Sequence, residues 1–192
     1  MMLTPAPNLH RAPPHRPGTG TVPDTSHLDP LIAALPERID ENNWHTVAAY
    51  AEGFRLAADH YSWEAHEAWE AVWHRTAPQS LPHELLRGLI QIANAELKLA
   101  LGQRNATVRL IDIAAQHLQS ASPKSRATTV LGLVPTDLSA ALADWRTAFA
   151  ALPKQQSTAM QTAIEFERRQ QTILPNSPRF PWPTIKINQH AA

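Results

Sequence analysis

Two sets of polar side chains in the middle of the chain have residue types and spacings that could support chemistry. The first set is His66 and Glu70, which are four positions apart and therefore lie side by side if this segment is helical. An imidazole beside a carboxylate can act as an oriented general base. If the protein is an enzyme, we predict that His66 is the base and that Glu70 orients it.

The second set falls on the following predicted helix, on one narrow stripe with spacings of four, three and four residues: Arg87, Gln91, Asn94 and Lys98. The rest of that helix is apolar almost all round, so its polar stripe must reach water, a groove or polar groups of another helix. We predict that the two sets line one cleft, in which the two cations bind a small anionic ligand. The alternative, which the pattern alone favours, is a structural network that fixes the register of the two helices.

A metal site on His66 and Glu70 is a further hypothesis. Di-iron carboxylate bundles take histidine and carboxylate ligands from several helices, whereas here one helix carries them and the facing stripe supplies amides and cations. Glu64 and Glu67 are interpreted as solvated residues of the first helical turn. The chain has no cysteine for a thiolate site, and it has no phosphate-binding loop or dinucleotide-binding glycine motif. We therefore predict no metal and no cofactor.

Apolar side chains recur at helical spacing from residue 29 onward. The pattern predicts a short segment at 31–35 and longer helices at about 44–58, 62–75, 80–101, 105–119, 136–153 and 157–173. The most apolar stretch, Leu85 to Leu101, is predicted to be a central buried helix that pairs with the next one as a hairpin. The predicted fold class is all-α, a compact multihelical domain of about six helices around this buried hairpin.

The predicted ends of these helices depend on a few polar residues and one glycine. Ser62, Ser80, Asn105 and Thr136 are suitable residues for the N-terminal ends, and Gly102 suits the position that follows a helix. The tryptophans of the helix at 62–75 are predicted to belong to the core and not to a stacking platform.

Prolines mark both ends of the chain. Residues 1–28 contain six prolines and few bulky apolar residues, so we predict a disordered tail there. Residues 29–174 are predicted as one helical domain, and residues 175–192 as an extended segment that Trp182 and Ile185 anchor on the helices. Glu96, which lies among leucines, is predicted to be tied to a cap or an arginine and not to be catalytic.

The charge balance limits the possible partners. Lysine plus arginine and aspartate plus glutamate number 17 each, so the chain lacks the basic field that favours nucleic acid or a membrane surface. The proline-interrupted N-terminus has no apolar signal segment, and a cytoplasmic location is expected.

Two motifs carry a resemblance to a known family. Residues 64–73 fit EAHExWExxW, and residues 88–93 fit GLIQxA. Together they resemble the helical family catalogued as domain of unknown function 309, with a family-like core at about 50–118. The resemblance implies a multihelical fold and no established activity. Asn94 departs from it, because the family commonly has a small apolar residue there.

Three functions are compatible with these patterns. The leading hypothesis is a non-catalytic helical module that binds an unknown protein or a small anionic ligand. The second is an enzyme that acts on an anionic substrate through His66 and Glu70. The third is a metal-dependent hydrolase that uses the same two residues.

Overall fold

The computed structural model describes residues 25–123, 129–151 and 178–185, and in them the chain is all-α. Six α-helices lie in these parts: α1 (Asp29–Ala33), α2 (Ala48–Ala58), α3 (Ser62–Trp73), α4 (Leu81–Ala100), α5 (Arg104–Ser120) and α6 (Pro135–Ala150). Short 3-10 turns at Ser26–Leu28 and Trp44–Thr46 precede α1 and α2. The predicted fold class is confirmed. No helix in the described parts is both long and apolar enough to cross a membrane.

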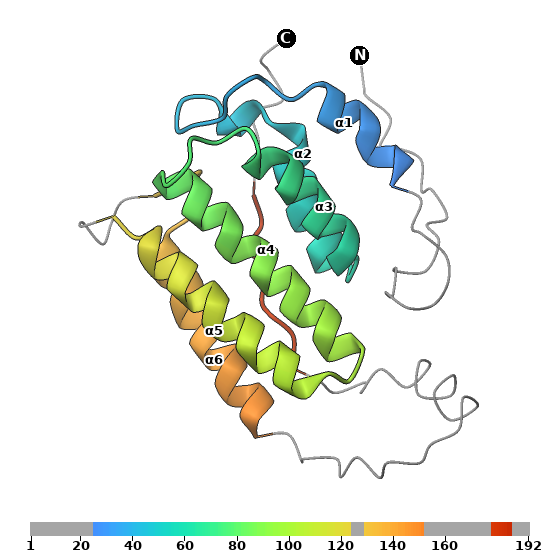
Figure 1. Cartoon of the computed structure of the whole chain (residues 1–192), viewed down its shortest axis with the longest axis vertical. Coiled ribbons are helices and arrows are strands. Elements are labelled where there is room, and N and C mark those ends of the chain that lie inside the picture. The colour runs from blue at the N-terminus through green and yellow to red at the C-terminus, as the bar shows by residue number, and fades with distance from the viewer. Residues whose placement is uncertain (1–24, 124–128, 152–177, 186–192) are drawn as a thin grey trace.

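Helix α4 is the central element, and it packs against α3 on one side and α5 on the other (Figure 1). Its leucines and isoleucines at 85, 86, 89, 90 and 92 are buried, as the apolar stretch predicted. The Ser80 hydroxyl accepts a hydrogen bond from the backbone N–H of His83 at 3.2 Å, which caps the first turn. Gly102 follows the helix with a φ of 69°, a left-handed conformation that glycine adopts without strain. The predicted hairpin of α4 with α5 is therefore confirmed.

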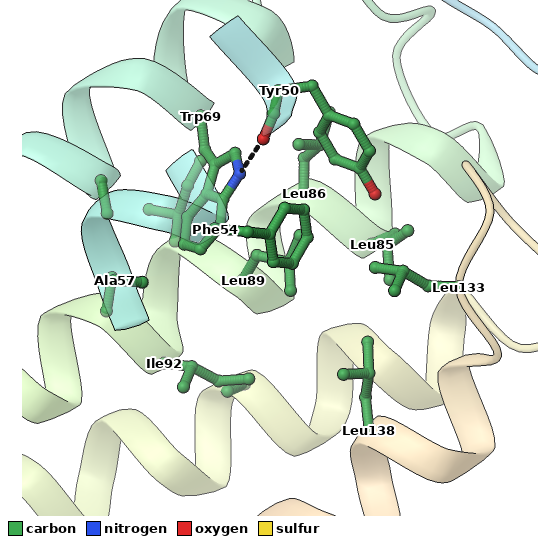
Figure 2. Close-up of a cluster of buried hydrophobic side chains, with 14 of the residues drawn as sticks. Tyr50, Phe54, Ala57, Trp69, Leu85, Leu86, Leu89, Ile92, Leu133 and Leu138 are labelled. Carbon is green, nitrogen blue, oxygen red and sulfur yellow. Dashed lines mark hydrogen bonds between the residues drawn. The ribbon is translucent and has the colours of Figure 1, made fainter. Parts of the chain in front are cut away.

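An aromatic cluster joins α2 to α3 and to the apolar face of α4 (Figure 2). Phe54 packs edge-on against both Tyr50 and Trp69, with ring centroids 5.1 Å and 4.9 Å away. The indole N–H of Trp69 donates to the carbonyl of Tyr50 at 3.2 Å, and Gly53 allows this indole to lie directly on the α2 backbone. Trp69 is fully buried, so the prediction of a core role is confirmed for this tryptophan.

Residues 178–185 run behind α4 in the view of Figure 1, as an extended segment that contains neither helix nor strand. Phe180 is buried in the core, and Trp182 and Ile185 pack against it, which confirms the predicted anchoring. The indole N–H of Trp145 on α6 donates to the carbonyl of Pro178 at 2.7 Å. This segment therefore connects α6 to the centre of the bundle.

Several predicted boundaries are wrong by a few residues. Ser62 is the first residue of α3 and caps nothing, because its hydroxyl points to Glu96 on α4. Helix α5 begins at Arg104 and α6 at Pro135, so Asn105 and Thr136 lie inside the helices. Leu28, the last residue of the predicted tail, is buried. The rest of that tail before residue 25 and the predicted helix at 157–173 lie outside the described residues.

Candidate functional site

Helices α3 and α4 run antiparallel, and this pairing decides which polar residues meet. The Ser62 hydroxyl at the start of α3 lies 3.4 Å from Glu96 near the end of α4, and Thr76 just after α3 lies 3.1 Å from His83 at the start of α4. Between these contacts, the Nδ1 of His66 lies 2.7 Å from the Oδ1 of Asn94. Of the predicted stripe on α4, Asn94 is therefore the residue that reaches the predicted His66 and Glu70 pair.

The contact with Asn94 orients the His66 ring. An amide oxygen only accepts hydrogen bonds, so Nδ1 must carry the proton and donate it. The other ring nitrogen, Nε2, lies 3.4 Å from Oε2 of Glu70. Trp63 stacks on the imidazole with centroids 6.0 Å apart and an interplanar angle of 18°. The ring is thus held on one edge and one face, while Nε2 points toward the carboxylate.

Glu67 completes this group, although the sequence pattern assigned it to the solvated face. One ligand-type atom from each of His66, Glu67 and Glu70 lies within 4.8 Å of the other two. Burial raises the pKa of Glu67; the charge of His66 lowers it, and the charges of Glu70 and Glu64 raise it further. The site therefore consists of one imidazole and two carboxylates that lie close together.

Glu64 also differs from the prediction of a solvated residue. Its side chain is 6% exposed, and its Oε2 is buried without a hydrogen-bond partner. A helical wheel places position 64 away from the α4 contact, which is why the pattern suggested solvent. The spacing of apolar residues in α3 does not by itself predict that Glu64 is buried.

Arg87 does not join His66. Its guanidinium lies 3.4 Å from Oε1 of Glu84, and Oε2 of Glu84 lies 2.8 Å from Nδ1 of His117 on α5. Burial alone would raise the pKa of Glu84, but the hydrogen bond and charge of His117, together with Arg87, lower it. Arg87 is thus directed to the α5 side of α4. Within the described residues, no hydrogen bond or ion pair joins it to His66 or Glu70.

The other two members of the stripe, Gln91 and Lys98, are partly exposed on α4. A pocket of about 290 Å³ lies elsewhere, between the loop before α2 and the start of α4. Its lining consists of Arg38, Ile39, Asp40, Glu41, Asn42, Ala77, Ser80 and Pro82. Of the six predicted residues, His66, Glu70 and Asn94 therefore come together, whereas Arg87 pairs with Glu84.

Comparison with known proteins gives one match. The family model described as domain of unknown function (DUF309) matches residues 50–110, from α2 into α5, which confirms the resemblance carried by the two motifs. No curated protein and no solved structure matches the chain. His66, Glu67, Glu70 and Asn94 all lie inside the matched segment.

Proposed function

We propose that this protein is a non-catalytic helical binding module whose binding face is the exposed edge of α3 and α4 around His66. The observation that carries the proposal is the way in which His66 is held. Its Nδ1 lies 2.7 Å from Oδ1 of Asn94, and Trp63 stacks on its ring. Its Nε2 faces the partly exposed carboxylate of Glu70. A half-buried histidine that is held in one orientation beside a partly exposed carboxylate suits ligand recognition.

The catalytic alternative has less support. A general base needs its free nitrogen beside the substrate, but Glu70 already faces Nε2 of His66. Arg87, which the sequence suggested as a binding group for an anionic substrate, is paired with Glu84 on the other side of α4. These observations favour binding over acid–base chemistry.

The charge of the site favours a cationic ligand over the anionic one that Arg87 and Lys98 suggested. Glu67 and Glu70 lie beside His66, and 43% of the Glu70 side chain is exposed. An anion at this position would be repelled by both carboxylates. The balanced charge of the chain supports a partner other than nucleic acid or a membrane. The proposal places this binding in the cytoplasm.

Thermal-shift measurements on the full chain would test the proposal. Wild-type protein is compared with His66→Ala in the presence of three ligand panels, namely divalent metal ions, organic amines and anionic metabolites. We expect at least one cationic ligand to raise the melting temperature of the wild type and not that of His66→Ala. His74→Ala is the matched control, because His74 is an exposed histidine at the end of the same helix. Equal shifts in wild type and His66→Ala for every ligand would contradict the proposal.

A further inference from the structure

Three potential ligand atoms converge on the solvent-facing edge of α3. They come from His66, Glu67 and Glu70, and all lie within 4.8 Å of one another. We infer that these residues form a site for a divalent first-row transition-metal ion of the Zn²⁺ type, and that Asn94 orients its histidine. This inference rests on the proposed binding role of the same face and names the chemistry of its ligand.

The separation of His66 and Glu70 suits two ligands of one ion better than it suits a hydrogen bond. Nε2 and Oε2 are 3.4 Å apart, which is long for a hydrogen bond between nitrogen and oxygen. Two donors that each lie about 2.1 Å from a tetrahedral Zn²⁺ are roughly 3.4 Å apart. The i and i+4 positions are also the spacing of the two histidines in the zinc-binding helix motif H-E-x-x-H. The backbone of α3 therefore already places this pair at a suitable distance.

Glu67 supplies the third donor through a small side-chain movement. The present spread of 4.8 Å exceeds the donor separation of a tetrahedral site, roughly 3.4 Å, by roughly 1.4 Å. The carboxylate of Glu67 is partly exposed on the first turns of α3, and its side chain has three rotatable bonds. The inferred site requires that rotation about these bonds bring the Glu67 carboxylate closer to His66 and Glu70.

Asn94 is placed to orient His66, as a hydrogen-bond acceptor orients many metal-bound histidines. Such histidines donate their other ring N–H to a carbonyl or carboxylate oxygen, which fixes the tautomer and the ring orientation. The 2.7 Å contact of Nδ1 with Oδ1 of Asn94 is a contact of this kind, and it leaves Nε2 on the side of Glu70. The α4 residue in contact with His66 is thus a neutral asparagine and not a cation that would repel a metal ion, since Arg87 pairs with Glu84.

The donor set indicates which ions the site would take. One imidazole and two carboxylates suit Zn²⁺, Co²⁺ or Mn²⁺, and two carboxylates balance the charge of a divalent ion. Three protein ligands leave at least one coordination position for water or for a donor from a partner molecule. His66 and Glu70 are 19% and 43% exposed at their side chains, so an ion can enter from solvent.

Metal titration of the full chain tests the inference. Protein freed of metal with a chelator is titrated with ZnCl₂ in a calorimeter, and Co²⁺ absorption spectra report the ligand field. We expect one site in the wild type. His66→Ala and the double variant Glu67→Gln/Glu70→Gln should bind about tenfold or more weakly, whereas His74→Ala should match the wild type. Circular dichroism and melting temperature establish that each variant is folded.

Asn94 provides a test that separates orientation from general stability. Asn94→Ala removes the acceptor and should weaken Zn²⁺ binding by about tenfold to a hundredfold. Asn94→Asp restores an acceptor oxygen and should bind at least as tightly as the wild type.

Two results would overturn the inference. Wild-type protein could bind Zn²⁺ and Co²⁺ no better than His66→Ala, or His74→Ala could lose as much affinity. If metal titration fails while an organic amine still gives a thermal shift that depends on His66, the metal inference is wrong and the binding proposal stands. If no ligand gives such a shift, both are wrong.

Discussion

The indole N–H of Trp182 donates a hydrogen bond to Oε2 of Glu96 at 3.1 Å, across 86 residues of sequence. The backbone N–H of Phe180 donates to the other oxygen at 3.2 Å, and the Ser62 hydroxyl lies 3.4 Å from Oε2. Glu96 is 4% exposed. A single buried carboxylate on α4 therefore accepts hydrogen bonds from both the C-terminal segment and the start of α3.

Removing the Glu96 carboxylate should destabilise the protein. Glu96→Ala leaves the buried N–H of Phe180 and the partly buried indole N–H of Trp182 without an acceptor, and it creates a small cavity. We expect the free energy of unfolding to decrease by about 2 to 4 kcal/mol. Urea denaturation at pH 7, followed by circular dichroism, measures this change. Glu96→Gln keeps the size and one acceptor oxygen, so it should lose less than Glu96→Ala; the opposite order would contradict the assignment.

Glu96 should also make stability depend on pH. Burial raises its pKa from 4.5 to about 7, although hydrogen bonds from Trp182 and Phe180, the charge of Arg179 and the Ser62 hydroxyl lower it. An acid with a raised pKa binds its proton more tightly in the folded state, so its contribution is largest below pH 4.5 and decreases as the pH rises to 7. The decrease amounts to about 3 kcal/mol.

The measurement of this pH effect compares two proteins. Urea denaturation is carried out between pH 4.5 and pH 7.5 on the wild type and on Glu96→Gln, which cannot titrate at this position. The stability of the wild type should fall relative to that of the variant as the pH rises. Parallel pH profiles would show that Glu96 titrates as it does in the unfolded chain.

Gly53 should not tolerate a larger side chain. A methyl group at this position of α2 would overlap the indole of Trp69, which is rigid and fully buried. Alanine favours a helix over glycine by about 1 kcal/mol, but the overlap should reverse the sign and destabilise Gly53→Ala by about 1 to 3 kcal/mol. Gly88→Ala on α4 is the control, because its methyl group would meet the flexible side chain of Leu118 at 2.8 Å. Calorimetric melting curves should show the larger loss for Gly53→Ala.

The pair of Glu84 and His117 should matter more for stability than the pair of Glu84 and Arg87. Glu84 and His117 are each 15% exposed at their side chains and lie 2.8 Å apart, whereas Arg87 is 45% exposed and 3.4 Å away. His117→Ala should cost about 1 to 3 kcal/mol, because it leaves a largely buried carboxylate short of a donor. Arg87→Ala should cost less than about 1 kcal/mol and leave the His66 site unaffected. Equal losses in urea denaturation would contradict this order.

The candidate site could be predicted from the sequence only within one helix. The spacing of His66 and Glu70 was sufficient to place them together, because side chains four residues apart share a face of any α-helix. The contact of His66 with Asn94 depends on the antiparallel register of α3 and α4, which the periodicity of neither helix specifies. For the same reason the sequence does not show whether Arg87 faces α3 or α5, and the structure places it beside Glu84.

Local sequence patterns are sufficient to predict the all-α class, the central position of Leu85 to Leu101, the capping of α4 by Ser80 and the end of α4 before Gly102. These features follow from local periodicity and backbone preference, which act over a few residues. The position of Glu67 beside His66, the burial of Glu64 and the contact of Glu96 with the segment at 180–182 are visible only in the folded protein. Such relationships depend on how helices pack, and packing is determined by contacts between residues far apart in the chain.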